Sequence, residues 1–406
     1  MVTAGAQATW TVTQPNGVQA AIQAAAPGDI ILLPNTGGAP DYAPFTVDKG
    51  VTIRGDGCRI GHALPGIASP SGTLVVNVPV GQRAHLDGLD LSFSYSASMG
   101  NTGLRLVVGG GSVTMQRCTI RCRVGDAIQI TAGTLLCQSC TIESACLTNL
   151  GGVASAAFAG GHGIVSNGAS VFLRDCTVRG SALSVFWAGG LQFSFWSAGS
   201  GVVLDSGTLH AERTSFFGGH GTVGPGLFVH SGAPAIYAIG ASRVWLADGS
   251  ATGGNSTNGS TGAAGLLNSS GFAADVEAMV FQGGSPSGLG SLGPVNAAPL
   301  ARLAVTPPWQ RGATSTLTVR GSASALFGLA LALDPTPTVQ PFAIEPLWIS
   351  NSVWITAGLL DAGGVASLGV AVPNVPSLQH QVVWCQALSG FSLPLRATTP
   401  AGGLIL

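Results

Sequence analysis

The chain has 406 residues, of which 61 are glycine and only 8% are charged, and its formal net charge is −1. Nucleic acids and anionic membrane surfaces select basic proteins, so this charge balance excludes both as expected partners. The positive mean hydropathy argues against disorder, and no apolar run is long enough and free enough of glycine for a membrane helix. We therefore expect a folded protein with no membrane insertion.

The N-terminal segment predicts a short helix followed by two strands. One face of the predicted helix is apolar and consists of Val18, Ala21, Ile22 and Ala25. A Pro-Gly-Asp turn ending at Asp29 follows, and then come the apolar run 30–33 and the segment 45–57, in which glycines indicate turns. No basic stretch followed by an apolar one precedes the helix, so no signal peptide is visible.

An eight-residue pattern recurs along the chain, with apolar residues at positions one, three, six and eight and a mostly polar doublet between the pairs. Alternation within each pair is the period of a strand, and the doublet predicts a bend. The copies span 84–91, 113–120, 135–142, 171–178, 209–216 and 274–281. The sixth positions of the first five copies are 29, 22, 36 and 38 residues apart. This spacing predicts a coil of about 22 residues with loop insertions.

These features resemble the right-handed parallel β-helix repeat proteins of the pectin-lyase-like superfamily. The resemblance is most specific in 17–34 and 45–57, where the order is helix, Pro-Gly-Asp turn, strand, Lys-Gly, strand and Gly-x-Gly. It implies an all-β chain whose right-handed parallel β-helix is capped at its open end by the N-terminal helix. It also implies a bacterial protein at an extracellular or cell-surface location.

Stacked coils place equivalent residues one strand spacing apart, at about 4.8 Å, so repeated residue types form ladders. One inward ladder is expected to consist of Cys118, Cys140 and Cys176, packing as small apolar side chains. Cys137 and Cys140 form a CxxC, but no second such pair or spaced histidines accompany it, which favours core packing over zinc or redox chemistry. If any pair forms a disulfide, we expect it to be Cys122 with Cys146.

The polar doublets are expected to form a second ladder that faces solvent. If their coils are adjacent, Arg174 meets Glu212 and Asp175 meets Arg213. Exposed pairs of this kind contribute roughly 0–1 kcal/mol each, so we interpret them as markers of register.

The character of the chain changes near residue 295. The Gly/Ser/Asn-rich stretch 241–294 keeps strand-like pieces, so we interpret it as the final coils with long loops, and we divide the chain into 1–295 and 296–406. Strand candidates after the boundary are 301–305, 314–319, 326–333, 348–355, 365–372, 382–388 and 404–406. Short strands at this spacing predict a small antiparallel β-sandwich. It resembles the C-terminal β-sandwich of many secreted bacterial proteins.

Grouped acidic residues, which polysaccharide lyases and glycoside hydrolases of this fold require, are missing from the sequence. The 17 acidic residues include no Asp-Asp or Asp-x-Asp pair. Gly-His-Gly occurs twice, around His162 and His220, and its recurrence near a coil motif indicates a repeated turn. We therefore expect no enzyme, and we assign no catalytic residue, cofactor or metal ligand.

One segment is unusually rich in aromatic residues, with five in eleven positions: Phe186, Trp187, Phe193, Phe195 and Trp196. Two interpretations remain open. The side chains pack on the flank of the coils or on the C-terminal domain, or they form an exposed patch that binds sugar or another subunit.

Two functions from different classes follow from these patterns. The first is a non-catalytic extracellular structural protein that self-associates into filaments or a surface layer, because low charge removes repulsion between copies. The second is a polysaccharide-active enzyme or a glycan-binding protein of the tailspike or adhesin kind, for which polysaccharide would be the partner.

Overall fold

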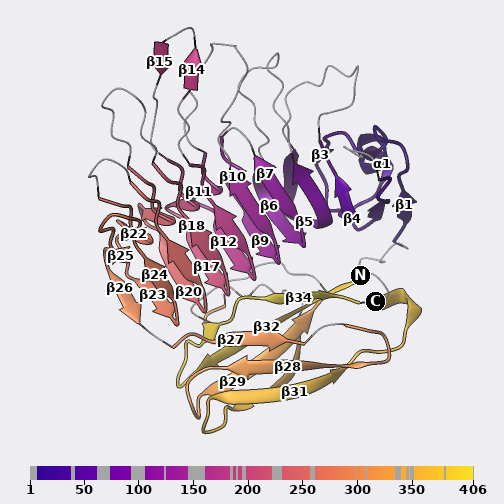
Figure 1. Cartoon of the computed structure of the whole chain (residues 1–406). Helices are drawn as coiled ribbons and strands as arrows, with labels where there is room; N and C mark the ends of the chain where they lie inside the picture. Colours follow the sequence, from indigo (N-terminus) through magenta and orange to yellow (C-terminus); the bar gives the residue numbers. More distant parts are fainter. Residues whose placement is uncertain are drawn as a thin grey trace. The chain divides into compact units, whose positions relative to one another are not determined.

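The computed structural model describes residues 7–37, 42–61, 74–92, 106–122, 125–144, 161–182, 186–188, 191–193, 198–221, 231–256, 261–297, 299–306, 309–333, 340–343, 347, 352–378 and 381–405. Within them the chain is all-β apart from one short α-helix and one 3-10 turn (Figure 1). It forms two compact units, Met1–Asn296 and Ala297–Leu406. No helix in these residues has the length and apolar character needed to cross a bilayer.

The first unit, called here the parallel unit, is built from three parallel ladders in which each strand pairs with its equivalent in the next coil. The first ladder contains β8 (Ile128–Ile130), β11 (Ile164–Asn167), β16 (Val202–Asp205), β19 (Ile236–Ile239), β22 (Leu266–Asn268) and β25 (Ser291–Leu292). The second contains β9 (Thr134–Gln138), β12 (Ser170–Arg174), β17 (Thr208–Glu212), β20 (Arg243–Ala247), β23 (Ala274–Glu277) and β26 (Val295–Ala297). The third contains β7 (Thr119–Cys122), β10 (Thr141–Ser144), β13 (Thr177–Arg179), β18 (Ser215–Phe217), β21 (Ser250–Thr252) and β24 (Val280–Gln282).

The N-terminal strands join these ladders. They are β1 (Thr9–Thr11), β2 (Ile30–Leu33), β3 (Thr46–Val47), β4 (Thr52–Arg59), β5 (Val75–Ser92) and β6 (Leu106–Gln116). The long strands β5 and β6 bend between ladders, so that β6 pairs with both β8 and β9. The predicted helix is α1 (Val18–Ala24), and its buried residues Val18 and Ile22 join the same apolar core as the strands.

The lysine at position 49, the only one in the sequence, lies at the end of this helix. Its Nζ atom donates hydrogen bonds to the carbonyl oxygens of Gln23 and Ala25, both at 3.1 Å. Carbonyls in the last turn of a helix have no partner within the helix, and a cation there also opposes the negative end of the helix dipole. Lys49 therefore stabilises the end of α1.

The polar doublet is a bend in every copy of the repeat, and its second residue has a positive φ. These seven residues, called the corner residues, are Gly88, Arg117, Ser139, Asp175, Arg213, Asp248 and Ala278, with φ between 48° and 65°. At five of the seven corners the amide donates to the doublet carbonyl of the next coil, as in Ser139 to Arg174 at 2.9 Å and Asp175 to Glu212 at 3.1 Å. A non-glycine residue in this conformation costs roughly 1–2 kcal/mol, and the inter-coil hydrogen bond offsets part of that cost.

The predicted copies of the repeat pair with one another in register, as Val113 with Leu135 and Val171 with Leu209. The structure adds one copy that the pattern did not reveal, formed by β20 and β21, with Asp248 as its corner residue. Its sixth position is Gly249, which has no side chain, whereas the sixth positions of the other copies hold Leu, Cys, Thr or Met.

The C-terminal unit contains two antiparallel sheets that share one apolar core, in a β-sandwich-like arrangement. The three-stranded sheet has the order β27 (Arg302–Val305), β28 (Thr314–Arg320), β31 (Val365–Ala371). The five-stranded sheet has the order β30 (Val353–Leu359), β29 (Leu326–Ala332), β32 (Val382–Gly390), β33 (Arg396–Ala397), and β34 (Ala401–Leu404) also pairs with β32. The 3-10 turn Pro376–Leu378 precedes β32. The strand predicted at 348–355 is shifted, because β30 continues to Leu359, and Trp348 lies outside the described residues.

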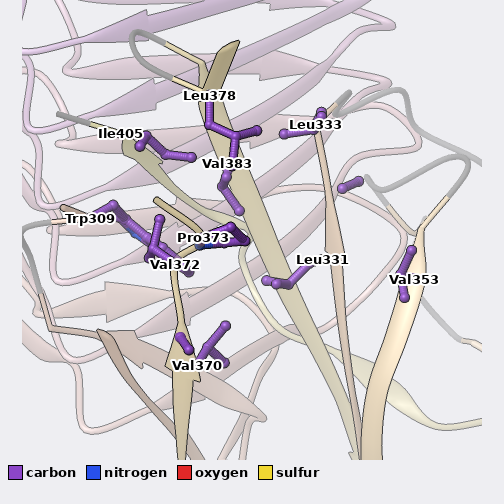
Figure 2. Close-up of a pocket in the computed structure, with 12 residues that line it drawn as sticks. Trp309, Leu331, Leu333, Val353, Val370, Val372, Pro373, Leu378, Val383 and Ile405 are labelled. Atoms are coloured by element: carbon purple, nitrogen blue, oxygen red, sulfur yellow. The ribbon is translucent and has the colours of Figure 1, made fainter. Parts of the chain in front are cut away.

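An apolar cavity of about 420 Å³ lies within this unit (Figure 2). Side chains from both sheets surround it, among them Leu331, Val353, Val370 and Val383. The indole of Trp309 is buried in its wall, and its Nε1 atom has no hydrogen-bond partner among the described residues.

Ser139 allows the strain at a corner to be measured, because its side chain is exposed and its φ is 53°. We expect Ser139→Val to lower the free energy of unfolding by about 1–2 kcal/mol, since a β-branched residue is the least tolerant of positive φ. Ser139→Gly, the matched control, should stay within about 0.5 kcal/mol of the wild type, because relief of strain offsets the added freedom of the unfolded chain. Denaturant unfolding of both variants checks this, and equal stabilities would contradict it.

Candidate functional site

The aromatic segment is described only in part. Phe186 and Trp187 lie in β14 (Phe186–Ala188), and Phe193 lies in β15 (Leu191–Phe193). The two strands pair antiparallel, with Phe186 opposite Phe193 and Trp187 opposite Gln192. Phe195 and Trp196 fall outside the described residues. The backbone thus brings three of the five residues onto one hairpin, and the interaction patch itself stays a prediction.

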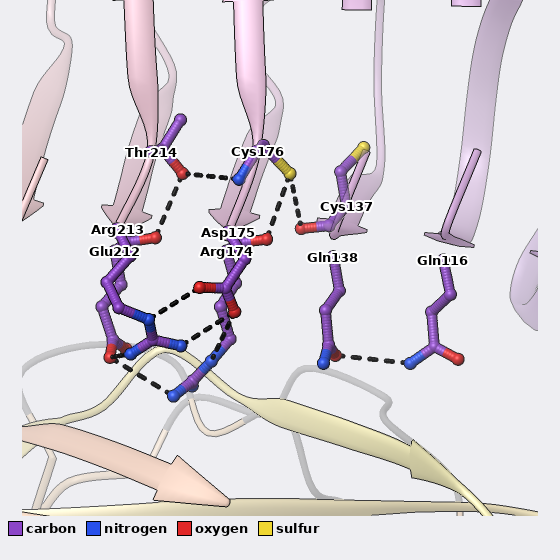
Figure 3. Close-up of polar contacts among 9 residues, drawn as sticks. All are labelled: Gln116, Cys137, Gln138, Arg174, Asp175, Cys176, Glu212, Arg213 and Thr214. Carbon is purple, nitrogen blue, oxygen red and sulfur yellow. Dashed lines mark hydrogen bonds and ion pairs between the residues drawn. The ribbon is translucent and has the colours of Figure 1, made fainter. Parts of the chain in front are cut away.

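The charged doublets at the ends of β12 and β17 form a cluster of four side chains (Figure 3). Asp175 and Arg213 make two parallel hydrogen bonds of 2.7 and 2.8 Å. Arg174 Nη2 donates to Glu212 Oε1 at 3.3 Å, and Arg213 Nη1 also donates to Glu212 Oε1. Both predicted pairs are therefore confirmed.

The two pairs differ in burial, which the sequence did not predict. The side chains of Arg174 and Glu212 are only 2% and 3% exposed, whereas those of Arg213 and Asp175 are 37% and 38% exposed. Burial raises the pKa of Glu212, and the positive charges of Arg174 and Arg213 oppose that shift. The expectation that both doublet residues face solvent is therefore wrong for the first residue of these two doublets.

Other acidic residues of the parallel unit are bound in the same way. Asp87 accepts two hydrogen bonds from Arg117, at 3.0 and 2.7 Å. Glu143 lies between Arg121 and Arg179, at 3.3 and 3.7 Å. In every case the partner comes from a neighbouring coil, because β5, β7, β10 and β13 are adjacent strands. These carboxylates therefore hold neighbouring coils in register.

The three ladder cysteines are buried reduced thiols, as predicted. Each follows a corner residue, and its Sγ donates to the carbonyl two residues earlier, as in Cys176 to Arg174 at 3.2 Å and Cys118 to Gln116 at 3.2 Å. Thr214 occupies the same position in the next coil, and its hydroxyl donates to the Glu212 carbonyl at 3.1 Å (Figure 3). The ladder side chains therefore donate hydrogen bonds to carbonyl oxygens at the bend, and they also pack in the core.

The pair Cys122 and Cys146, expected to be the one linked if any disulfide forms, is not tested. Cys122 is buried, and Cys146 lies outside the described residues. Burial raises the pKa of the Cys140 thiol, which makes this ladder cysteine a poor nucleophile at neutral pH.

The two Gly-His-Gly histidines make the same contact. His162 Nδ1 accepts a hydrogen bond from the Ser200 amide, and His220 Nδ1 accepts one from the Asn255 amide, both at 2.9 Å. Each acceptor reaches the backbone of a neighbouring coil, since the chain positions differ by about one coil. A ring nitrogen that accepts a backbone hydrogen bond stabilises the turn in which it lies. This agrees with the interpretation of Gly-His-Gly as a repeated turn.

A stack of three aromatic rings on the second ladder was missed by sequence reasoning. His210 lies between Phe172 and Trp245, with ring centroids 4.5 and 4.2 Å away and interplanar angles of 4° and 17°. All three occupy the second position of their repeat copies, but the alignment of copies contained only Phe172 and His210, because the copy that holds Trp245 was missed. His210 Nε2 is buried without a partner among the described residues, and burial lowers the pKa of His210 to about 3.

No three His, Cys, Asp or Glu side chains in the described part of the chain lie together as metal ligands would. A search of protein-family models gives no match to this sequence, and neither does a search of curated proteins.

The difference in burial within the four-residue cluster leads to a prediction about stability. Glu212→Ala removes a carboxylate from a buried guanidinium, so we expect the free energy of unfolding to fall by about 3 kcal/mol or more. Asp175→Ala, the matched control in the exposed pair, should cost about 1 kcal/mol or less. Denaturant unfolding at neutral pH compares the two, and a larger cost for Asp175→Ala would contradict the assignment.

The buried histidines make stability depend on pH. Burial lowers the pKa of His210 to about 3 and that of His85 to about 4, against an ordinary value of 6.5. Below pH 6.5 the unfolded chain therefore binds protons that the folded chain does not, and the free energy of unfolding falls until the folded-state pKa values are reached. For one such histidine the loss at pH 5 is at most about 2 kcal/mol.

The variant His210→Phe keeps a ring in the stack and removes the titrating group. We expect it to lose less stability than the wild type between pH 7.5 and pH 5, by up to about 2 kcal/mol. Denaturant unfolding at both pH values measures the difference. An identical decline in the two proteins would show that His210 is not protected from protonation in the fold.

Proposed function

We propose that the parallel unit is a right-handed parallel β-helix related to the pectin-lyase-like repeat proteins. Three observations support this: three parallel ladders, a bend of the same conformation in every coil, and the start of the chain. There Val18 and Ile22 place α1 on the apolar core, which suits a helix that covers the first coil. The C-terminal unit is then the appended β-sandwich.

We further propose that the chain is a non-catalytic extracellular structural protein that self-associates. The observation that carries this proposal is which partners the acidic side chains bind. Asp87, Glu143, Asp175 and Glu212 each bind arginines of neighbouring coils instead of converging on a cleft. Acid–base cleavage of a polysaccharide requires carboxylates that face the substrate, and these face their own stack.

Low charge supports the association of copies. Only 8% of the residues are charged and the net charge is −1, so little electrostatic repulsion opposes contact between chains. A coil stack has two different ends, and head-to-tail contact between different surfaces propagates into filaments when it does not close.

The test is the state of the purified full chain. We expect light scattering to give a mass above one chain, and negative-stain electron microscopy to show regular assemblies. Incubation with uronate polymers, with and without Ca²⁺, should release no products. Cleavage of a uronate polymer would contradict the proposal and would favour the polysaccharide-active alternative.

The double variant Trp187→Ala/Trp196→Ala tests the role of the aromatic segment in the same assays. Loss of assembly would make this segment a subunit contact, and loss of glycan binding would support the glycan-binding alternative. If neither property changes, the aromatic side chains serve packing.

A further inference from the structure

Two short segments connect the third ladder of each coil to the first ladder of the next. The outgoing segment follows β13, β18, β21 or β24, and the returning segment precedes β11, β16, β19, β22 or β25. One residue in each segment joins it to its neighbours by backbone hydrogen bonds, and we call these the column residues. In chain order they are Gly161, Ser181, Gly199, Gly219, Ala233, Gly254, Ala263, Gly284 and Gly288.

The column residues form one unbroken line of backbone hydrogen bonds. Each outgoing residue donates its amide to the returning residue before it in the chain, and its carbonyl accepts from the returning residue after it. Gly219, for example, donates to Gly199 at 2.8 Å and accepts from Ala233 at 2.9 Å. All eight bonds of the line measure 2.8–3.0 Å, and none of them involves a side chain. The column therefore satisfies backbone groups of every segment in it without the help of side chains.

Glycine is required in these segments for space. A Cβ on the glycine before each outgoing column residue would lie 1.8–2.0 Å from the carbonyl oxygen of the returning column residue that follows. These four glycines are Gly180, Gly218, Gly253 and Gly283. A Cβ on Gly199 would likewise lie 1.9 Å from the carbonyl oxygen of Gly161. None of these glycines has a positive φ, so their role is to let two backbones approach closely.

The stretch that joins an outgoing column residue to the next returning one varies in length from coil to coil. It spans 182–198, 220–232, 255–262 and 285–287, which is 17, 13, 8 and 3 residues. In the last of these coils three residues are enough, and Gly288 donates to Gly284 at 2.8 Å across them. The entropic cost of closing a loop grows only with the logarithm of its length. The same column therefore closes long and short stretches alike.

The longest stretch, 182–198, contains the aromatic segment. Its two strands, β14 and β15, pair with each other and form a sheet separate from the three ladders (Figure 1). Among the described strands no ladder strand pairs with either of them.

We infer that the glycine column is a device that makes the coils independent of the loops they carry. The stretch 182–198 is then an appendage, and the parallel unit folds without it. This inference goes beyond the proposed self-association and does not depend on it, because it concerns what the coils require and not what the loops contact.

Two replacements of 182–198 test the inference in the full chain. One inserts Ser-Pro-Ser, the sequence of 285–287, and the other inserts the eight residues of 255–262. Amide hydrogen exchange in β13 and β16, the strands on either side of the stretch, measures the outcome. We expect protection factors within about threefold of the wild type, because the column can close over either insert.

Gly199→Ala tests the column itself. It keeps the loop and places a Cβ against the Gly161 carbonyl, so protection in β13 and β16 should fall roughly tenfold or more, or the chain should not fold. Gly271→Ala is the matched control, because no atom lies within 4 Å of its added Cβ, and it should leave protection unchanged. Loss of protection in both replacement chains would overturn the inference. Equal protection in Gly199→Ala and Gly271→Ala would overturn it as well.

Discussion

The bend between the second and third ladders is the constraint on which the parallel unit depends. Seven corner residues take a left-handed conformation, and only Gly88 does so without a Cβ. At five of these corners the amide donates a hydrogen bond to the doublet carbonyl of the next coil, at 2.9–3.1 Å. One hydrogen bond per coil therefore fixes the spacing of the coils at the point where the strand direction changes.

The side chains around the bend follow from that geometry. In several coils the residue after the corner has a short side chain with a polar end that reaches the carbonyl two residues earlier, as Cys118, Cys176 and Thr214 do. The doublet residues stand one strand spacing from their equivalents, so opposite charges in successive coils pair as Arg174 and Glu212 do. Charged residues are scarce in this chain, and several of them pair with charged residues of a neighbouring coil and so hold the register.

The sequence predicted the phase of the coils well, because apolar alternation and the recurring doublet report directly on which residues point inward. It predicted the two ion pairs for the same reason. It missed the copy around Asp248, where glycine replaces the marker side chain, and the burial of Arg174 and Glu212. It also missed the ring stack at Phe172, His210 and Trp245, because the repeat pattern was defined only by the residues expected to point inward. Burial of outward residues depends on neighbours that no local pattern contains.

Hydrogen exchange at the corner amides tests the account most directly. If each bend is held by a bond to the next coil, the amides of Ser139 and Asp175 should exchange as slowly as amides within β9 and β12. Exchange at the rate of an exposed turn would contradict the account, because the corners would then be ordinary surface loops and the register would have to come from the strands alone.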